Sequence, residues 1–401
     1  MLQKREERNV APFLSLKELR MKKFSIYFFL ILFLNTALGA DTLSLSFFQN
    51  MTDNLFQNRY SEPDQISSFN FYIDKNISGF SFFTEGNYSY LHKNPKLAYY
   101  LHDIGIDYLR PVNEKTAFYF SLIGQGAFYR SDYEDFNYFS FNFLAAFKTY
   151  ISQTSILKSN YILEYKKYKY SLFDFVSHSV FLSFDKFFQT KTTLKSEISW
   201  GYKNFLHPYS SEEAIPEDYT EDNHSGRRTY IFVPKIEYEE QGIQIFSIKG
   251  LIAQGVGDRI GLRISGMKQW ILSGGNPFSS VEEFYMVENP SYDSYSWTGY
   301  QLSSQLAVLV PWDIELKIGY TVDNKEFHGI ESMSLEGDTL GITRKDERGQ
   351  FEARLEKNFP KFSIFLSYFY IDNQSNDPFF DWQSNLFSVG IELNTFINKK
   401  K

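Results

Sequence analysis

The stretch DIELKIGYTV, residues 313–322, alternates between polar and apolar side chains without a break. The same alternation recurs over residues 194–203, 351–359 and 387–394. A less regular form of it occupies residues 104–110, 116–122 and 139–147. A period of two gives a β-strand one apolar and one polar face, whereas a helix would mix both kinds of side chain on each face. These segments therefore predict long, two-faced strands and exclude helix for most of the chain.

The amino-acid composition narrows the class of protein. The 401 residues include 42 Phe and 29 Tyr, and the aromatic share of 19% is far above ordinary usage. The negative mean hydropathy argues against a bundle of membrane-spanning helices. The absence of cysteine excludes a disulfide scaffold, thiol catalysis and Cys-ligated metal sites. A net charge of -7 argues against nucleic acid as a partner, since a nucleic-acid-binding surface would be basic.

The alternating segments are long for a soluble protein. Each covers about 10–14 residues, close to the ~9–11 that a tilted membrane-spanning strand needs and above the ~5–6 of soluble strands. Aromatic residues near their ends are typical of the girdles at a membrane surface: Tyr99, Tyr108, Trp200, Tyr202, Trp297, Tyr300, Trp312 and Trp382. The alternatives are a secreted β-sandwich array and a β-propeller, although a propeller would repeat a motif in each blade. Residues 41–401 are therefore predicted to form one all-β domain, an antiparallel transmembrane up-and-down β-barrel.

Residues 1–40 resemble a leader rather than a part of the barrel. Two lysines after Met21 precede an apolar run over residues 24–34, and small side chains follow. This order predicts a signal peptide cleaved near residue 40. The run is shorter than the ~17–25 residues of a membrane anchor, which is the alternative. Translation starts at Met1 or at Met21. A leader followed by a barrel predicts localisation in a bacterial outer membrane.

Short and long connections alternate along residues 41–401, as in outer-membrane barrels, whose periplasmic turns are short and whose outer loops are long. Both termini are then periplasmic, and the number of strands is even. An even number requires one added strand, which we predict over residues 278–288. With short turns at 239–242 and 273–277, the predicted count is 18 strands, and 16 is the alternative. In this count the short connection 255–258 falls on the outer side.

Two stretches resemble a known kind of barrel. Residues 43–56 (LSLSFFQNMTDNLF) are similar to first strands that end in a turn of the pattern Asp/Ser-Asn-Leu/Val-Phe. Residues 370–382 (YIDNQSNDPFFDW), followed by Asn385 and Gly390, resemble a closing hairpin. Both are similar to the barrels that follow tetratricopeptide repeats, of the surface lipoprotein assembly modifier type. The resemblance implies an outer-membrane barrel, here without the helical-repeat domain.

The last strand resembles the signal that the barrel-assembly machinery reads. It contains Gly390 and keeps apolar residues on one parity up to Leu393, although Phe396 is one position out of phase. The expected partners are therefore this machinery, outer-membrane lipid and lipopolysaccharide, together with a periplasmic protein encoded elsewhere. No cofactor is expected.

Signals for catalysis and metal binding are weak. The adjacent pairs His178–Ser179 and His102–Asp103 cannot act on one substrate, because neighbours in a strand point to opposite faces. We therefore predict no catalytic residue and do not expect an enzyme. Acidic residues crowd the segment 210–222, but their order lacks the EF-hand pattern for Ca²⁺. A solvated anionic loop is the preferred interpretation of that segment, and loose Ca²⁺ or Mg²⁺ binding is the alternative.

The polar parity of the strands defines the predicted inner wall. Its charged residues are Asp107, Lys195, Glu197, Lys203, Lys235, Glu237, Glu315, Lys317, Glu352, Arg354, Glu356 and Glu392. Acids and bases are nearly balanced, so we expect at most a weak cation preference. Barrels of 16–18 strands usually enclose an aqueous channel. We therefore expect a passive pore or export channel for small polar solutes or a polymer. The alternative is a non-conducting barrel, closed by a loop such as 204–227 or 323–347, that displays its outer loops as an adhesin or scaffold.

Overall fold

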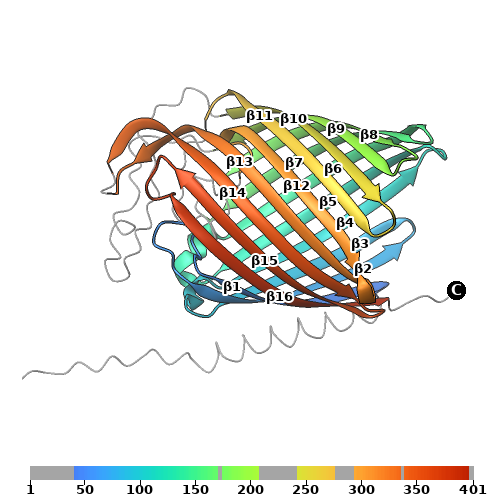
Figure 1. Ribbon diagram of the computed structural model, residues 1–401, viewed down its shortest axis with the longest axis horizontal. Coiled ribbons are helices and arrows are strands. Elements are labelled where there is room, and N and C mark those ends of the chain that lie inside the picture. The colour runs from blue at the N-terminus through green and yellow to red at the C-terminus, as the bar shows by residue number, and fades with distance from the viewer. Residues whose placement is uncertain (1–39, 170–173, 207–241, 276–292, 336–337, 397–401) are drawn as a thin grey trace, which may run out of the picture.

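The computed structural model describes residues 40–169, 174–206, 242–275, 293–335 and 338–396, where sixteen strands close into one antiparallel barrel (Figure 1). In chain order they are β1 (Thr42–Thr52), β2 (Asp64–Ile77), β3 (Phe80–Leu91), β4 (Tyr99–Pro111), β5 (Thr116–Tyr129), β6 (Tyr138–Ser152), β7 (Ser155–Tyr168), β8 (Phe175–Phe187), β9 (Thr192–Phe205), β10 (Gly242–Val256), β11 (Ile260–Ser273), β12 (Trp297–Val310), β13 (Ile314–Met333), β14 (Thr339–Asn358), β15 (Phe362–Ser375) and β16 (Trp382–Phe396). The predicted signal peptide, up to residue 39, lies outside the described residues.

The first and last strands close the barrel. β1 pairs with β16 along its whole length, with Thr42 opposite Phe396. Just past the end of β1, Asp53 accepts two hydrogen bonds from Asn385 of β16: the backbone N–H donates to Oδ1 at 2.7 Å, and Nδ2 donates to Oδ2 at 2.6 Å. The two stretches that resemble assembly-modifier barrels therefore lie side by side at one seam.

The two rims of the barrel differ in their connections. The turn end, where β1 begins and β16 ends, has short connections such as residues 78–79 and the 3-10 helix η5 (Pro311–Asp313). The opposite rim, the loop end, carries longer segments with the 3-10 helices η1 (Pro95–Leu97) and η2 (Ser131–Phe136). In the part of the chain that the structure describes, no helix is long and apolar enough to cross a membrane.

Apolar side chains cover the outside of the barrel. Ile104, Ile264 and Leu302 are 61%, 66% and 55% exposed. They share one parity of their strands, whereas Asp107 of β4 and Arg263 of β11 lie on the other parity. So much exposed apolar surface is unfavourable in water but suits contact with lipid. The predicted all-β antiparallel transmembrane barrel is therefore present.

The predicted count of 18 strands is wrong, because the ladder closes with 16. β9 pairs directly with β10, and β11 pairs directly with β12, so neither position leaves room for another strand. The strand predicted over residues 278–288 and the turn at 239–241 lie outside the described residues. The apolar alternation of a segment shows that it could be a strand, but only pairing decides whether it enters the barrel.

The wrong strand count also puts two predicted connections on the wrong rim of the barrel. The short connection 257–259 joins β10 and β11 at the turn end, whereas we expected an outer connection at 255–258. Ser273 lies at the loop end, where a periplasmic turn was predicted. The expected outer loop 323–347 is also mostly strand, because β13 and β14 continue as 20-residue strands. Their hairpin projects beyond the neighbouring strands at the loop end (Figure 1).

Candidate functional site

Contacts across the barrel identify the side chains that face the lumen. Tyr295 precedes β12, which is four strands away from β8, yet its hydroxyl lies 2.9 Å from Ser179 Oγ of β8. Lys203 Nζ of β9 lies 3.2 Å from Asp293 Oδ2 of the same segment. These contacts pass through the interior, so Ser179 and Lys203 point inward. Strand alternation and the pairing register then assign the inward positions of the other strands.

All predicted lumen residues on described strands occupy inward positions. They are Asp107 on β4, Lys195, Glu197 and Lys203 on β9, Glu315 and Lys317 on β13, Glu352, Arg354 and Glu356 on β14, and Glu392 on β16. Lys235 and Glu237 lie outside the described residues. That these side chains line a conducting path stays a prediction.

Several inward charges are neutralised along their own strand. Lys317 Nζ lies 2.9 Å from Glu315 Oε2 on β13. On β14, Arg354 Nη2 lies 2.9 Å from Glu356 Oε2, and its guanidinium stacks 4.0 Å from the ring centre of Phe365. Residues two apart on a strand face the same side, which brings each pair together.

Alternation did not predict the inward charges on the less regular strands, nor those of β13 and β14 that fall in or next to the expected loop 323–347. The missed carboxylates are Asp64, Asp74, Glu85, Asp103, Glu164, Asp185, Asp323 and Asp346, and the missed cations are Lys148, Lys158, Lys166, Lys249, Arg263, Lys325, Arg344 and Arg348. The signal was present on β2, where Asp74 and Tyr72 share a parity opposite to the apolar Phe71 and Ile73. Only the pairing register between strands shows which alternate positions of a strand face the lumen and which face outward.

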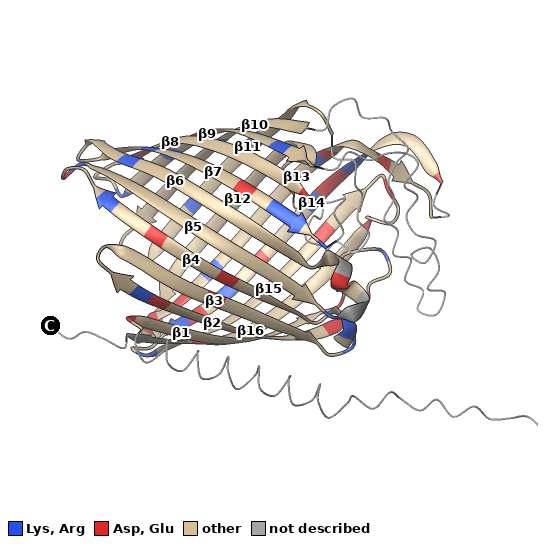
Figure 2. Cartoon of the chain, turned by 180° about the vertical axis from the view of Figure 1, so that it is seen from behind, with Lys and Arg blue, Asp and Glu red and all other residues tan. Residues whose placement is uncertain are grey.

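The inward charges are sorted by wall. On β2–β5 the inward charged residues of the described strands are carboxylates only: Asp64, Asp74, Glu85, Asp103 and Asp107. On β6–β11 cations predominate: Lys148, Lys158, Lys166, Lys195, Lys203, Lys249 and Arg263, against Glu164, Asp185 and Glu197. Figure 2 marks the charged positions along the strands. Walls of opposite sign create a field across the lumen that orients a dipolar solute.

Lys203 sits in an aromatic box at the loop end of the lumen. Its side chain is nearly inaccessible to solvent, and Nζ lies 4.2 Å from the ring centre of Phe175 and 5.1 Å from that of Phe205. The ion pair with Asp293 and these cation–π contacts compensate the cost of burying the ammonium group. Burial also raises the pKa of the Tyr295 hydroxyl, because surroundings of low polarity disfavour the charged phenolate. Together these contacts hold the segment before β12 inside the barrel.

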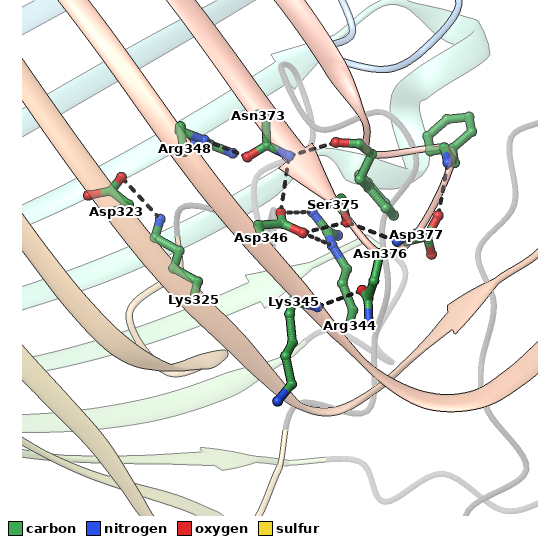
Figure 3. A network of polar contacts seen from close by, with 12 residues as sticks. Asp323, Lys325, Arg344, Lys345, Asp346, Arg348, Asn373, Ser375, Asn376 and Asp377 are labelled. Carbon is green, nitrogen blue, oxygen red and sulfur yellow. Dashed lines mark hydrogen bonds and ion pairs between the residues drawn. The ribbon is translucent and has the colours of Figure 1, made fainter.

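A second buried cation, Arg344, lies where the β13–β14 hairpin leaves the barrel (Figure 3). It donates from Nη2 and Nε to the two carboxylate oxygens of Asp346 at 2.6 and 3.1 Å. Its guanidinium stacks 4.4 Å from the ring centre of Phe327 and 3.3 Å from that of Phe380. Asp346 also accepts a hydrogen bond from Ser375 Oγ at 2.7 Å. This arrangement ties the hairpin to the connection between β15 and β16.

Apolar and aromatic residues pack at the loop end. Leu55, Leu91 and Leu97 are almost fully buried in one cluster. Trp297 and Trp382 are 5% and 3% exposed, so they do not belong to the outer girdle in which we expected them. The described connections therefore fold over the loop end and narrow the lumen there.

The two histidines of interest lie on the outer face. His178 Nδ1 is 2.8 Å from the hydroxyl of Tyr161, and His102 Nδ1 is 2.7 Å from the hydroxyl of Tyr100. Ser179 points into the lumen, away from the His178 ring, so the two cannot form a catalytic pair. Among the described residues, no group of three or more His, Asp or Glu side chains could hold a metal ion. The acidic segment 210–222 lies outside the described residues.

Neither a protein-family model nor a curated protein matches the sequence. Among solved structures, Acinetobacter baumannii OccAB3 is 9% identical, with a TM-score of 0.49 over 88% of this chain and 98% of that one. The outer membrane protein OpdK of Pseudomonas aeruginosa is 8% identical, with a TM-score of 0.47 over 88% and 99%. A. baumannii OccAB4 is 8% identical, with a TM-score of 0.48 over 89% and 98%. Similarity at this level carries no argument about the solutes that this barrel admits.

Proposed function

We propose that this protein is a passive pore for small polar solutes in a bacterial outer membrane. The observation that carries the proposal is the charged inner wall of a closed barrel whose outer wall is apolar. A lumen of low polarity would be filled by packed side chains, whereas charged walls on both sides favour water and hydrophilic solutes. The separation of a carboxylate wall on β2–β5 from a mainly cationic wall on β6–β11 favours solutes that carry both signs of charge.

The competing function is a non-conducting barrel that displays its loops. The packed residues at the loop end favour it, because Tyr295 and Lys203 hold one connection inside the barrel. An export role for a polymer belongs to the pore proposal as its second form. Lipopolysaccharide, outer-membrane lipid, the barrel-assembly machinery and a periplasmic protein are the partners that we propose.

Single-channel recording tests the pore directly. The full chain would be expressed with its own leader in a Gram-negative host that lacks its major porins, and then purified from the outer membrane. We expect stable, reproducible current steps in a planar bilayer. A folded protein, shown by heat-modifiable migration on a gel, that never conducts would reject the pore and favour the display function. Recovery of the protein from another membrane would reject the localisation.

A further inference from the structure

A hollow in the inner wall lies where β11 to β14 run side by side. Its volume is about 160 Å³, and its lining includes Arg263, Gln305, Gly319 and Glu352. Gly319 contributes no side chain, so the wall is recessed at its position. A single water takes up roughly 30 Å³, so the hollow has room for about five waters or a solute with a similar number of heavy atoms.

The residues around the hollow come from a single row of the ladder. Arg263 pairs with Gln305, Gln305 pairs with Gly319, and Gly319 pairs with Glu352. Strands lie about 4.8 Å apart, so the Cα atoms of Arg263 and Glu352 are separated by about 14 Å along the wall. Both residues line the hollow, and Gly319 lies between them in the row. In order along the row, the wall carries the cation of Arg263, the amide of Gln305, the recess at Gly319 and the carboxylate of Glu352.

The next row toward the loop end is neutral and polar. Ser303 pairs with Thr321, and Thr321 pairs with Gln350. The hydroxyl oxygens of Ser303 and Thr321 are 3.0 Å apart. All three residues line the hollow. They add hydroxyl and amide groups that can donate to or accept from a polar solute.

The two charges of the hollow differ from their neighbours on the turn side. Lys317 and Arg354, in the adjacent row, are each paired with a glutamate of their own strand. Neither Arg263 nor Glu352 forms an ion pair with any residue in the described part of the chain. An exposed guanidinium and a carboxylate on opposite sides of a recess are complementary to a solute with the reverse arrangement of charge.

We propose that this hollow binds small zwitterions that carry a carboxylate and an ammonium group, of the size of a short amino acid. The guanidinium of Arg263 holds the carboxylate through two hydrogen bonds, and Glu352 accepts from the ammonium group. Gln305 and Gln350 bind the remaining polar atoms above Gly319. The inference rests on the proposed pore, because the site faces the lumen and would select the solutes that cross.

Alanine and its uncharged isomer lactamide are suitable probes, because they share composition and size and differ in charge. Liposomes containing the purified protein would be swollen in isotonic alanine or lactamide. We expect alanine to enter about threefold to fivefold faster than lactamide, which corresponds to a weak, solvent-exposed ion pair. Arg263→Gln and Glu352→Gln should each bring the ratio of the two rates close to one while ion conductance persists.

Gly319→Leu separates a binding site from a general effect of wall charge. The substitution fills the hollow but keeps both charges, so it should also abolish the preference for alanine. Lys268→Gln, on the outer face of β11, is the matched control and should keep the ratio of the native protein. In a protein that conducts, equal rates for the two isomers would overturn the proposal. Retention of the preference in Gly319→Leu would also overturn it, because charge alone would then explain the selection.

A binding measurement distinguishes failure of the pore from failure of the site. Saturation-transfer NMR of alanine with the protein in micelles should show contact in the native protein and none in Arg263→Gln or Gly319→Leu. A protein that binds alanine in this way but does not conduct would reject the pore and keep the site. A conducting protein without this signal would keep the pore and reject the site.

Discussion

Arg344 shows how a charged side chain can be accommodated where the barrel meets its projecting hairpin. The residue is fully buried, and its carboxylate partner Asp346 is 2% exposed. Two aromatic rings stack on the guanidinium, and the carboxylate accepts further hydrogen bonds. A charge this far from water is tolerated only because each of these groups is in place.

We expect Arg344→Met to lower the free energy of unfolding by roughly 3–5 kcal/mol, because it leaves the Asp346 carboxylate buried without its main partner. Urea unfolding of the protein in lipid vesicles measures the change. Lys345→Met is the matched control: its ion pair with Glu326 is exposed, with side chains 58% and 50% accessible. That variant should change the free energy by no more than about 0.5 kcal/mol. Equal effects of the two substitutions would contradict this account.

The alternation of polar and apolar residues assigns a side chain to a face of its strand but does not identify its partners. Period two placed Lys203 with the inward residues of β9, in agreement with its position in the structure. Its burial depends on Asp293 and Tyr295, which lie about ninety residues further along the chain. In the same way, Arg263 and Glu352 flank one hollow only because Gly319 lies between their strands. Contacts of this kind depend on register, which alternation does not encode.

The direct pairing of β9 with β10 corrects the predicted strand count. Alternation identified parts of β9, β13, β14 and β16, because residues 194–203, 313–322, 351–359 and 387–394 each have a polar face and an apolar face. It failed between β9 and β12, where it predicted further barrel strands that the pairing of β9 with β10 and of β11 with β12 excludes. The choice is made by the hydrogen-bonded ladder, and no local pattern reports it.

Cysteine pairs test this pairing without background, because the chain contains no native cysteine. Ile198 lies opposite Ile248 in the register of β9 and β10, and both face outward. Facing residues of paired strands have Cα atoms about 4.5–5.5 Å apart, which a disulfide can bridge. We therefore expect Ile198→Cys with Ile248→Cys to form a disulfide on mild oxidation, seen as a mobility shift on a non-reducing gel.

The control for the cross-link is Ile198→Cys with Ile252→Cys, since Ile252 lies opposite Leu194 instead. That pair is offset by four residues and should stay reduced. A strand inserted between β9 and β10 would keep Ile198→Cys and Ile248→Cys apart. Failure of this pair to form a disulfide would therefore favour the larger strand count.

For the whole molecule, the arrangement of charge matters more than its total. Glu85 and Asp103 face each other across β3 and β4, within the wall that carries only carboxylates. The adjoining wall on β6–β11 is mainly cationic, so the two contributions partly cancel along the axis of the pore. Weak net selectivity is therefore consistent with strong local fields.

We expect the double variant Glu85→Gln, Asp103→Asn to lower the permeability ratio of cation to anion by about twofold, because it removes two carboxylates from one wall. Reversal potentials in gradients of dilute KCl measure the ratio, since a Debye length of about 10 Å at 0.1 M leaves the wall charges effective. Glu347→Gln, on the outer face of β14, should leave the ratio unchanged. A double variant with the native ratio would show that the ion path avoids β3 and β4.

The seam between β1 and β16 has a consequence for how this chain can be rearranged. The ladder there is antiparallel like every other, and both strands reach the same rim. A short linker could therefore join the two ends, and a cut at residues 257–259 would create new termini on that rim. The circularly permuted chain would keep every strand pair, so the order in which strands leave the ribosome is separable from the architecture that they build.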